Sequence, residues 1–154
     1  MAKTIPFRQR PQAALARKKR TLLLPMPLAQ AEDLVLRVHI ALDAMRRGKG
    51  NVYAAQTLTQ AMILAGFLAN AGHGAATFEQ MQQAEADISA AFDRGRDTGE
   101  WRLDDEAHGR FAVIVSTYDH QLHRAPLAAI VNAGEQLDRF QTGEPSAQLA
   151  RKRA

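Results

Sequence analysis

The sequence predicts an all-α protein, a five-helix antiparallel up-and-down bundle with an extended basic N-terminal arm. From residue 28 onward, apolar residues recur at the spacing of a helix. No segment of the sequence alternates convincingly with the period of two that marks a strand. The helices that this pattern predicts are joined by connections of about three to six residues, which favour antiparallel neighbours. The chain has 154 residues, 46% hydrophobic and 23% charged, which fits one globular domain.

The expected arm covers residues 1–27, and the expected helical body covers residues 28–141. Four of the six prolines lie in the arm: Pro6, Pro11, Pro25 and Pro27. Proline lacks the amide donor and disfavours a helical residue before it, so the arm should be extended or disordered. Residues 142–154 should form a flexible basic C-terminal tail.

Charge is distributed unevenly between the arm and the body. The body has ten basic and fifteen acidic residues, whereas the arm has no acidic residue and seven basic ones: Lys3, Arg8, Arg10, Arg17, Lys18, Lys19 and Arg20. Dense positive charge on a flexible segment suits phosphate groups without a preformed groove. If all seven contacted phosphates, a logarithmic plot of the binding constant against salt concentration would have a slope of roughly −6. These residues are the candidate nucleic-acid-binding set.

A short apolar run ends the arm. It consists of Leu22, Leu23, Leu24 and Met26. The leucines have no local apolar partner, so we expect the run to dock on the body or on a partner protein. A secretory signal has a longer apolar segment followed by a cleavage site, so the run does not fit one, and we expect a cytoplasmic protein.

The first two helices of the body are expected at residues 29–47 and 51–71. Five apolar residues of the first share one stripe: Leu34, Val38, Ala41, Leu42 and Met45. The second has no charged residue, yet polar residues interrupt it, whereas a membrane span needs about 20 apolar residues. We therefore expect no membrane contact and a helix buried in the bundle or shared with a second copy. Ala61, Ala65 and Ala69 form a row of small residues that another helix can approach closely.

Three more helices are expected at residues 78–98, from residue 104 through Leu122, and at residues 126–141. A capping box of Thr77 and Gln80 should begin the first of them. Trp101 and Leu103 should fold back on the core after it. Acidic residues begin the next helix, where the partial positive charge of a helix N-terminus favours them. The last helix has proline in its first turn, where it is tolerated.

No residue pattern predicts a catalytic centre. The chain has no cysteine, which excludes a disulfide scaffold and a thiol nucleophile. None of its three serines lies in a Gly-x-Ser-x-Gly motif. The segment Gly48-Lys49-Gly50 is too short for a phosphate-binding loop. We therefore expect a non-enzymatic protein.

Two histidines are candidate metal ligands. His120 and His123 lie three residues apart in one expected helix, so their rings can face the same way, with Asp119 beside them. The sequence lacks the repeated Glu-x-x-His motif of di-iron bundles. We expect no metal and no cofactor, and a metal-binding helical bundle is kept as a third hypothesis.

The residues Gly50, Asn51 and Ala55, followed by Leu58, resemble the start of the helix-turn-helix of the Fis family of bacterial DNA-binding proteins. The glycine turn and basic recognition helix of that family do not follow in this sequence. The layout of a basic proline-rich arm before an alanine-rich helical body is similar to that of small helical mobile-element proteins, some labelled Fis-family transcriptional regulators. The resemblance implies DNA binding and transcription regulation, and no DNA-contacting residue is transferred from it.

These observations predict a non-enzymatic, nucleic-acid-associated regulator or accessory protein. The arm would contact phosphates, of DNA rather than RNA, and the body would mediate a homodimer or another protein contact through its first two helices. The alternative is an adaptor or assembly subunit that binds only protein, through the arm and these helices.

Overall fold

The computed structural model describes residues 9–143 and contains six helices in that range. They are α1 (Gln9–Leu23), α2 (Leu28–Arg46), α3 (Val52–Asn70), α4 (Phe78–Thr98), α5 (Asp105–Arg124) and α6 (Leu127–Gln141). No strand occurs among these residues apart from an isolated bridge between Pro25 and Pro126. The all-α class is confirmed, and the expected starts of α2 to α6 lie within one residue of the observed ones.

The expectation of five helices after an extended arm is wrong for the described residues, because α1 is a helix of 15 residues. Pro11 lies in its first turn, where the amide groups have no acceptor within the helix, so proline costs little there. Pro25 and Pro27 follow its last residue. Residues 12–23 between them contain no proline and are mostly alanine, leucine, lysine and arginine, the strongest helix formers. Whether this segment is helical therefore depends on where each proline lies and not on how many prolines there are.

Side-chain caps explain where three helices of the body begin. Asn51 before α3 and Asp104 before α5 each accept a hydrogen bond of 2.8 Å from a backbone amide in the first turn. Thr77 and Gln80 form the expected capping box before α4, with hydrogen bonds of 2.9 and 3.1 Å.

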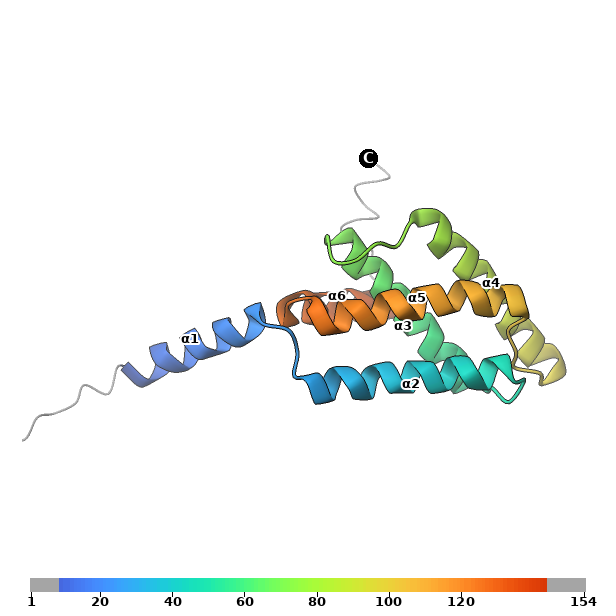
Figure 1. Ribbon diagram of the computed structural model, residues 1–154, viewed down its shortest axis with the longest axis horizontal. Coiled ribbons are helices and arrows are strands. Elements are labelled where there is room, and N and C mark those ends of the chain that lie inside the picture. Colours follow the sequence, from blue (N-terminus) through green and yellow to red (C-terminus); the bar gives the residue numbers. More distant parts are fainter. Residues whose placement is uncertain (1–8, 144–154) are drawn as a thin grey trace, which may run out of the picture.

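The centre of the body is occupied by α3. This helix packs against α2, α4, α5 and α6, and Figure 1 shows it running diagonally behind α5. Ala61 and Ala65 of the alanine row are buried. At this row α5 approaches closely enough for the Gln121 side chain to reach the Ala65 carbonyl at 3.0 Å. This uncharged helix therefore packs against every other helix of the body.

Within the described residues, α3 is also long and apolar enough to cross a membrane. The core helix of a soluble protein can have the same length and composition. Here α3 packs on four neighbouring helices, and 33% of its apolar stretch is buried. The absence of a membrane contact stays a prediction.

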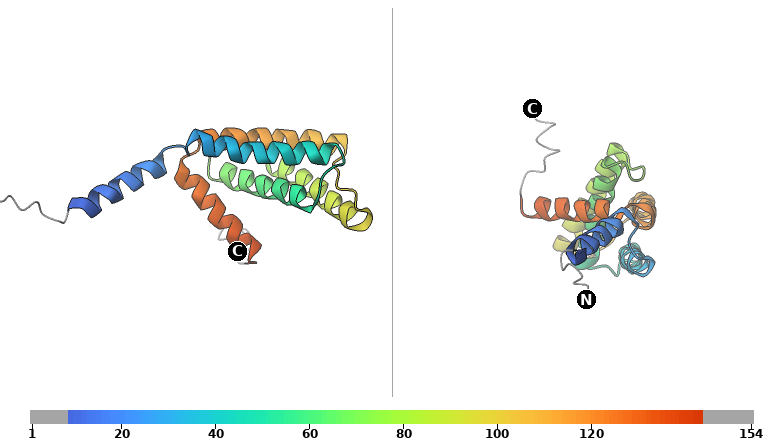
Figure 2. Two further views of the ribbon diagram at one scale, coloured as in Figure 1. Left: turned by 90° about the horizontal axis from the view of Figure 1, so that it is seen from below. Right: turned by 90° about the vertical axis from the view of Figure 1, so that its left-hand side faces the viewer.

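The last helix, α6, departs from the up-and-down arrangement. Only Ala125 and Pro126 separate it from α5, and Figure 2 shows it turning away from α5 at once. Its packing partners are α3 and α1. The start of α6 therefore lies close to the point where α1 joins the body.

Candidate nucleic-acid interface

Helix α1 contains the described part of the predicted nucleic-acid-binding set. Four exposed basic residues lie in its second half: Arg17, Lys18, Lys19 and Arg20. Lys3 and Arg8 lie outside the described residues, and so does the side chain of Arg10, whose backbone belongs to the first turn of α1. The structure thus places four of the seven predicted residues in one continuous helical segment.

This basic segment stands away from the bundle. Figure 1 shows α1 projecting to the left, and Figure 2 shows the same projection from below. Every described side chain from residue 12 to residue 21 is exposed. Among the side chains described from residue 12 to residue 143, no ion pair joins α1 to the body. The charges of α1 are therefore available to an external anion.

The junction after α1 fixes where the helix leaves the body. The Leu127 amide at the start of α6 donates a hydrogen bond of 2.8 Å to the Leu24 carbonyl, and Pro25 forms a bridge with Pro126. Two residues beyond Leu24, Met26 is buried in the core at 8% exposure. One end of α1 is therefore anchored to the body by a backbone hydrogen bond and a buried side chain.

The predicted docking run is divided by this junction. Met26 packs on the body, and Leu22 is half buried. Leu23 and Leu24 are 74% and 60% exposed, and the following Leu28 is also exposed. Of the predicted run, Leu23 and Leu24 therefore remain accessible to a partner protein.

The arginines of the body, in contrast to the α1 bases, often have acidic neighbours. The Arg110 guanidinium of α5 donates hydrogen bonds of 2.7 and 2.8 Å to the two Asp87 carboxylate oxygens of α4. This contact raises the pKa of Arg110. Three more pairs lie within a single helix or at its end: Arg37 with Asp33, Arg47 with Asp43, and Arg96 with Asp93. On α1, by contrast, four consecutive bases lie in a segment without any acidic residue.

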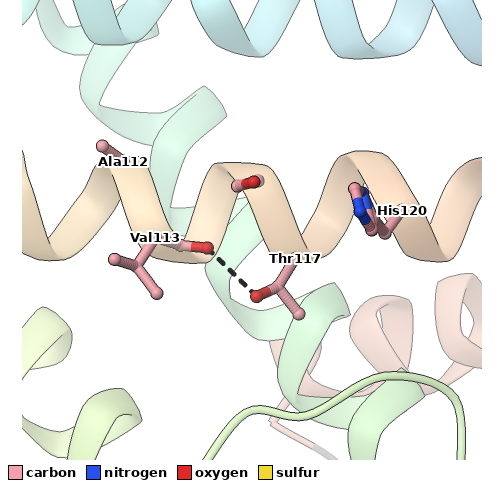
Figure 3. Close-up of a pocket in the computed structure, with 5 residues that line it drawn as sticks. Ala112, Val113, Thr117 and His120 are labelled. Carbon is pink, nitrogen blue, oxygen red and sulfur yellow. Dashed lines mark hydrogen bonds between the residues drawn. The ribbon is translucent and has the colours of Figure 1, made fainter.

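The two candidate metal ligands have separate surroundings. His123 Nδ1 lies 2.8 Å from Asp119 Oδ1, and Asp119 Oδ2 lies 3.8 Å from His39 Nε2 on α2. His120 instead lines an open groove along α5 (Figure 3). In residues 9–143 no group of three or more potential ligands is placed to hold a metal ion.

That groove has a volume of about 400 Å³ and is lined by five residues of α5: Ala112, Val113, Ser116, Thr117 and His120. The Thr117 hydroxyl donates a hydrogen bond of 3.0 Å to the Val113 carbonyl, as Figure 3 shows. Because one helix supplies every lining residue, the groove is a shallow surface depression without an opposite wall. A binding cleft that encloses a small ligand has walls on several sides.

The sequence predicts the basic residues of α1 as a phosphate-binding set, but they lie on a helix rather than on an extended arm. The signal was present, because residues 12–23 form a proline-free run of helix formers. The anchor from Leu127 to Leu24 had no local signal, since it joins two segments that only the folded chain brings together.

Comparison with protein-family models, with curated proteins and with solved structures finds no match to this chain. The resemblance to Fis-type proteins stays a prediction from the sequence. The residues that carry this resemblance lie at the start of α3, and α3 continues without a turn from Val52 to Asn70.

Proposed function

We propose that this protein is a non-enzymatic, nucleic-acid-associated regulator or accessory protein whose helix α1 contacts phosphate groups. The observation that supports this most is an exposed helix with four consecutive basic residues and no acidic residue, joined to a body in which acidic residues outnumber basic ones. Lysine and arginine supply most of the phosphate affinity of nucleic-acid-binding proteins. Repulsion between phosphates and the acidic body would direct a nucleic acid toward α1.

The test is binding of the full chain to a labelled DNA duplex, measured by fluorescence anisotropy at fixed low salt. The variant R17Q/K18Q/K19Q/R20Q removes four charges of α1 while glutamine retains a similar helix propensity. We expect its affinity to fall by about tenfold or more, because several phosphate contacts are lost together.

A matched control removes four exposed positive charges of the body in the variant R46Q/R47Q/K49Q/R124Q. Both variants have the same net charge, so a general charge effect would weaken them equally. The proposal requires the body variant to bind nearly as well as the unaltered chain. Unchanged binding by the α1 variant would contradict it.

The exposed leucines favour a second candidate, an adaptor that binds only protein. Leu23, Leu24 and Leu28 expose apolar surface beside the junction that anchors α1. This candidate predicts that a defined protein partner is retained after nuclease treatment and is lost with L23S/L24S. It also predicts no affinity for the DNA duplex. Light scattering on the same variants would show whether the partner is a second copy of the chain.

A further inference from the structure

We infer that α1 binds as an intact helix in the major groove of a DNA duplex, with its basic residues contacting phosphates on both sides of the groove. This inference rests on the proposed function and adds the form of the nucleic acid and the geometry of the contact. Three features of α1 support it: the directions of its charges, its slenderness and its anchorage.

The charges of α1 point in all directions around the helix axis. Successive residues of a helix are rotated by about 100°, so residues 17–20 spread over about 300° of the circumference. All four side chains are exposed. If α1 lay on the outside of a phosphate backbone, the cations of one face would contact phosphates and the others would point away. A groove with phosphates along both edges presents anions to opposite sides of the helix, so cations that point in different directions can each contact one.

The helix is slender before the basic residues. Ala13, Ala14 and Ala16 precede the basic segment, interrupted only by the exposed Leu15. An α-helix with its side chains is roughly 10–12 Å across, and the major groove of B-form DNA, about 12 Å wide, admits one. The major groove of A-form RNA is deep and narrow. The geometry therefore favours a DNA duplex over an RNA duplex.

The anchorage leaves α1 free on most sides. Its C-terminal end is attached to the body through Leu24 and Met26, whereas the described side chains from residue 12 to residue 21 are exposed. A helix of this length alone in water is only marginally stable, and like charges at Arg17 and Arg20, three residues apart, weaken it further. Phosphates on both sides would remove this repulsion.

The first test measures the salt dependence of duplex binding for single variants of the full chain, R17Q, K18Q, K19Q and R20Q. Groove insertion predicts that each variant reduces the slope of the logarithmic plot by about 0.9, the contribution of one phosphate contact. The body variant R46Q is the control and should leave the slope unchanged. If only neighbouring positions on one face of α1 change the slope, the helix lies outside the groove and the inference is wrong.

The second test uses duplexes of one sequence with cytosine or with glucosylated 5-hydroxymethylcytosine, which fills the major groove and leaves the phosphates unchanged. We expect the affinity for the glucosylated duplex and for an RNA duplex to be lower than that for the unmodified DNA by about tenfold or more. Equal binding of the two DNA duplexes would overturn groove insertion and leave the proposed function standing. Absence of binding to every duplex would overturn both. Self-association abolished by R17Q/K18Q/K19Q/R20Q, without duplex binding, would identify an acidic protein surface as the partner instead.

Discussion

At the scale of single residues, Gln121 connects three parts of the body. It is 2% exposed, and its Nε2 atom donates hydrogen bonds to the carbonyl oxygens of Ala65 in α3 and of His73 in the following loop, at 3.0 and 2.8 Å. Gly74, with a φ of +86°, lies against this amide, and a Cβ there would come within 2.9 Å of the Gln121 Nε2 atom. One buried side chain therefore sets the position of α5 relative to the end of α3.

We expect Gln121→Ala to lower the free energy of unfolding by about 2 kcal/mol or more. The substitution removes both hydrogen bonds, leaves two backbone carbonyls without this donor, and opens a cavity. Urea unfolding measures the change. Gln60→Ala, at an exposed position of α3, is the control and should change the same quantity by less than about 0.5 kcal/mol. Similar values for the two variants would show that Gln121 does not have this role.

Tyr118 should make the fold sensitive to alkaline pH. Burial raises the pKa of Tyr118 above its usual value of 10.0, because desolvation disfavours the phenolate. The folded state thus holds this proton more tightly than the unfolded chain, so the stabilisation is fully present below pH 10 and is lost as the pH rises above it. Between pH 9 and about 11, the free energy of unfolding of Tyr118→Phe should fall less than that of the unaltered chain. Tyr53→Phe, at a position that is 73% exposed, should behave like the unaltered chain; an equal fall for all three would refute the argument.

The apolar pattern of α5 predicted individual residues well. Six apolar residues that recur along α5 at the spacing of a helix are all buried: Ala107, Phe111, Ile114, Val115, Tyr118 and Leu122. The pattern did not predict that Gln121 is buried among them, because its hydrogen-bond acceptors belong to α3 and to a loop. A polar residue is expected to be exposed until its partners are known.

At the scale of elements, the connection from α4 to α5 folds back as expected and fixes both helices. Leu103 is buried, and its amide donates a hydrogen bond of 2.9 Å to the Met45 carbonyl at the end of α2. Trp101 meets Phe92 edge to face, with ring centroids 5.6 Å apart. Its indole also lies directly over Gly95, where a Cβ would collide with the ring. A glycine in the last turns of α4 is therefore required for packing.

Two glycine substitutions within helices should have opposite effects on stability. Gly95→Ala should lower the free energy of unfolding by about 1–3 kcal/mol, because the new methyl group overlaps the Trp101 ring. Gly109→Ala in α5, where nothing lies within 4 Å of a new Cβ, should raise it by up to about 1 kcal/mol through helix propensity. Thermal unfolding measures both. Stabilisation by Gly95→Ala would show that Trp101 does not pack over this site.

The helices of the body could be predicted from periodicity and capping residues, and the proline-free run at residues 12–23 had the propensity for α1, whereas the direction of α6 could not be predicted. A run without an apolar stripe, such as α1, shows only helix propensity, and the prolines on either side of it favour an extended arm instead. The course of α6 depends on where Pro126 meets Pro25 and where the Leu127 amide meets the Leu24 carbonyl. Contacts between distant segments of the chain have no periodic signal.

At the scale of the whole molecule, charge and shape divide the protein into a projecting basic helix and an acidic bundle. The separation of charge was visible in the sequence, because residues 9–23 contain five basic and no acidic residues. The projection of α1 was not, since it depends on the anchor at Leu24 and Met26. This arrangement presents the bases away from the carboxylates that would otherwise neutralise them or repel a phosphate.

The most direct test of this account is the salt dependence of DNA-duplex binding by the full chain and by R17Q/K18Q/K19Q/R20Q. If the four bases of α1 contact phosphates, the slope of the logarithmic plot for the variant should be smaller in magnitude by about 3.6, at about 0.9 for each contact. The body variant R46Q/R47Q/K49Q/R124Q should keep the slope of the unaltered chain. Equal slopes for the unaltered chain and the α1 variant would contradict the assignment of α1 as the nucleic-acid-binding element.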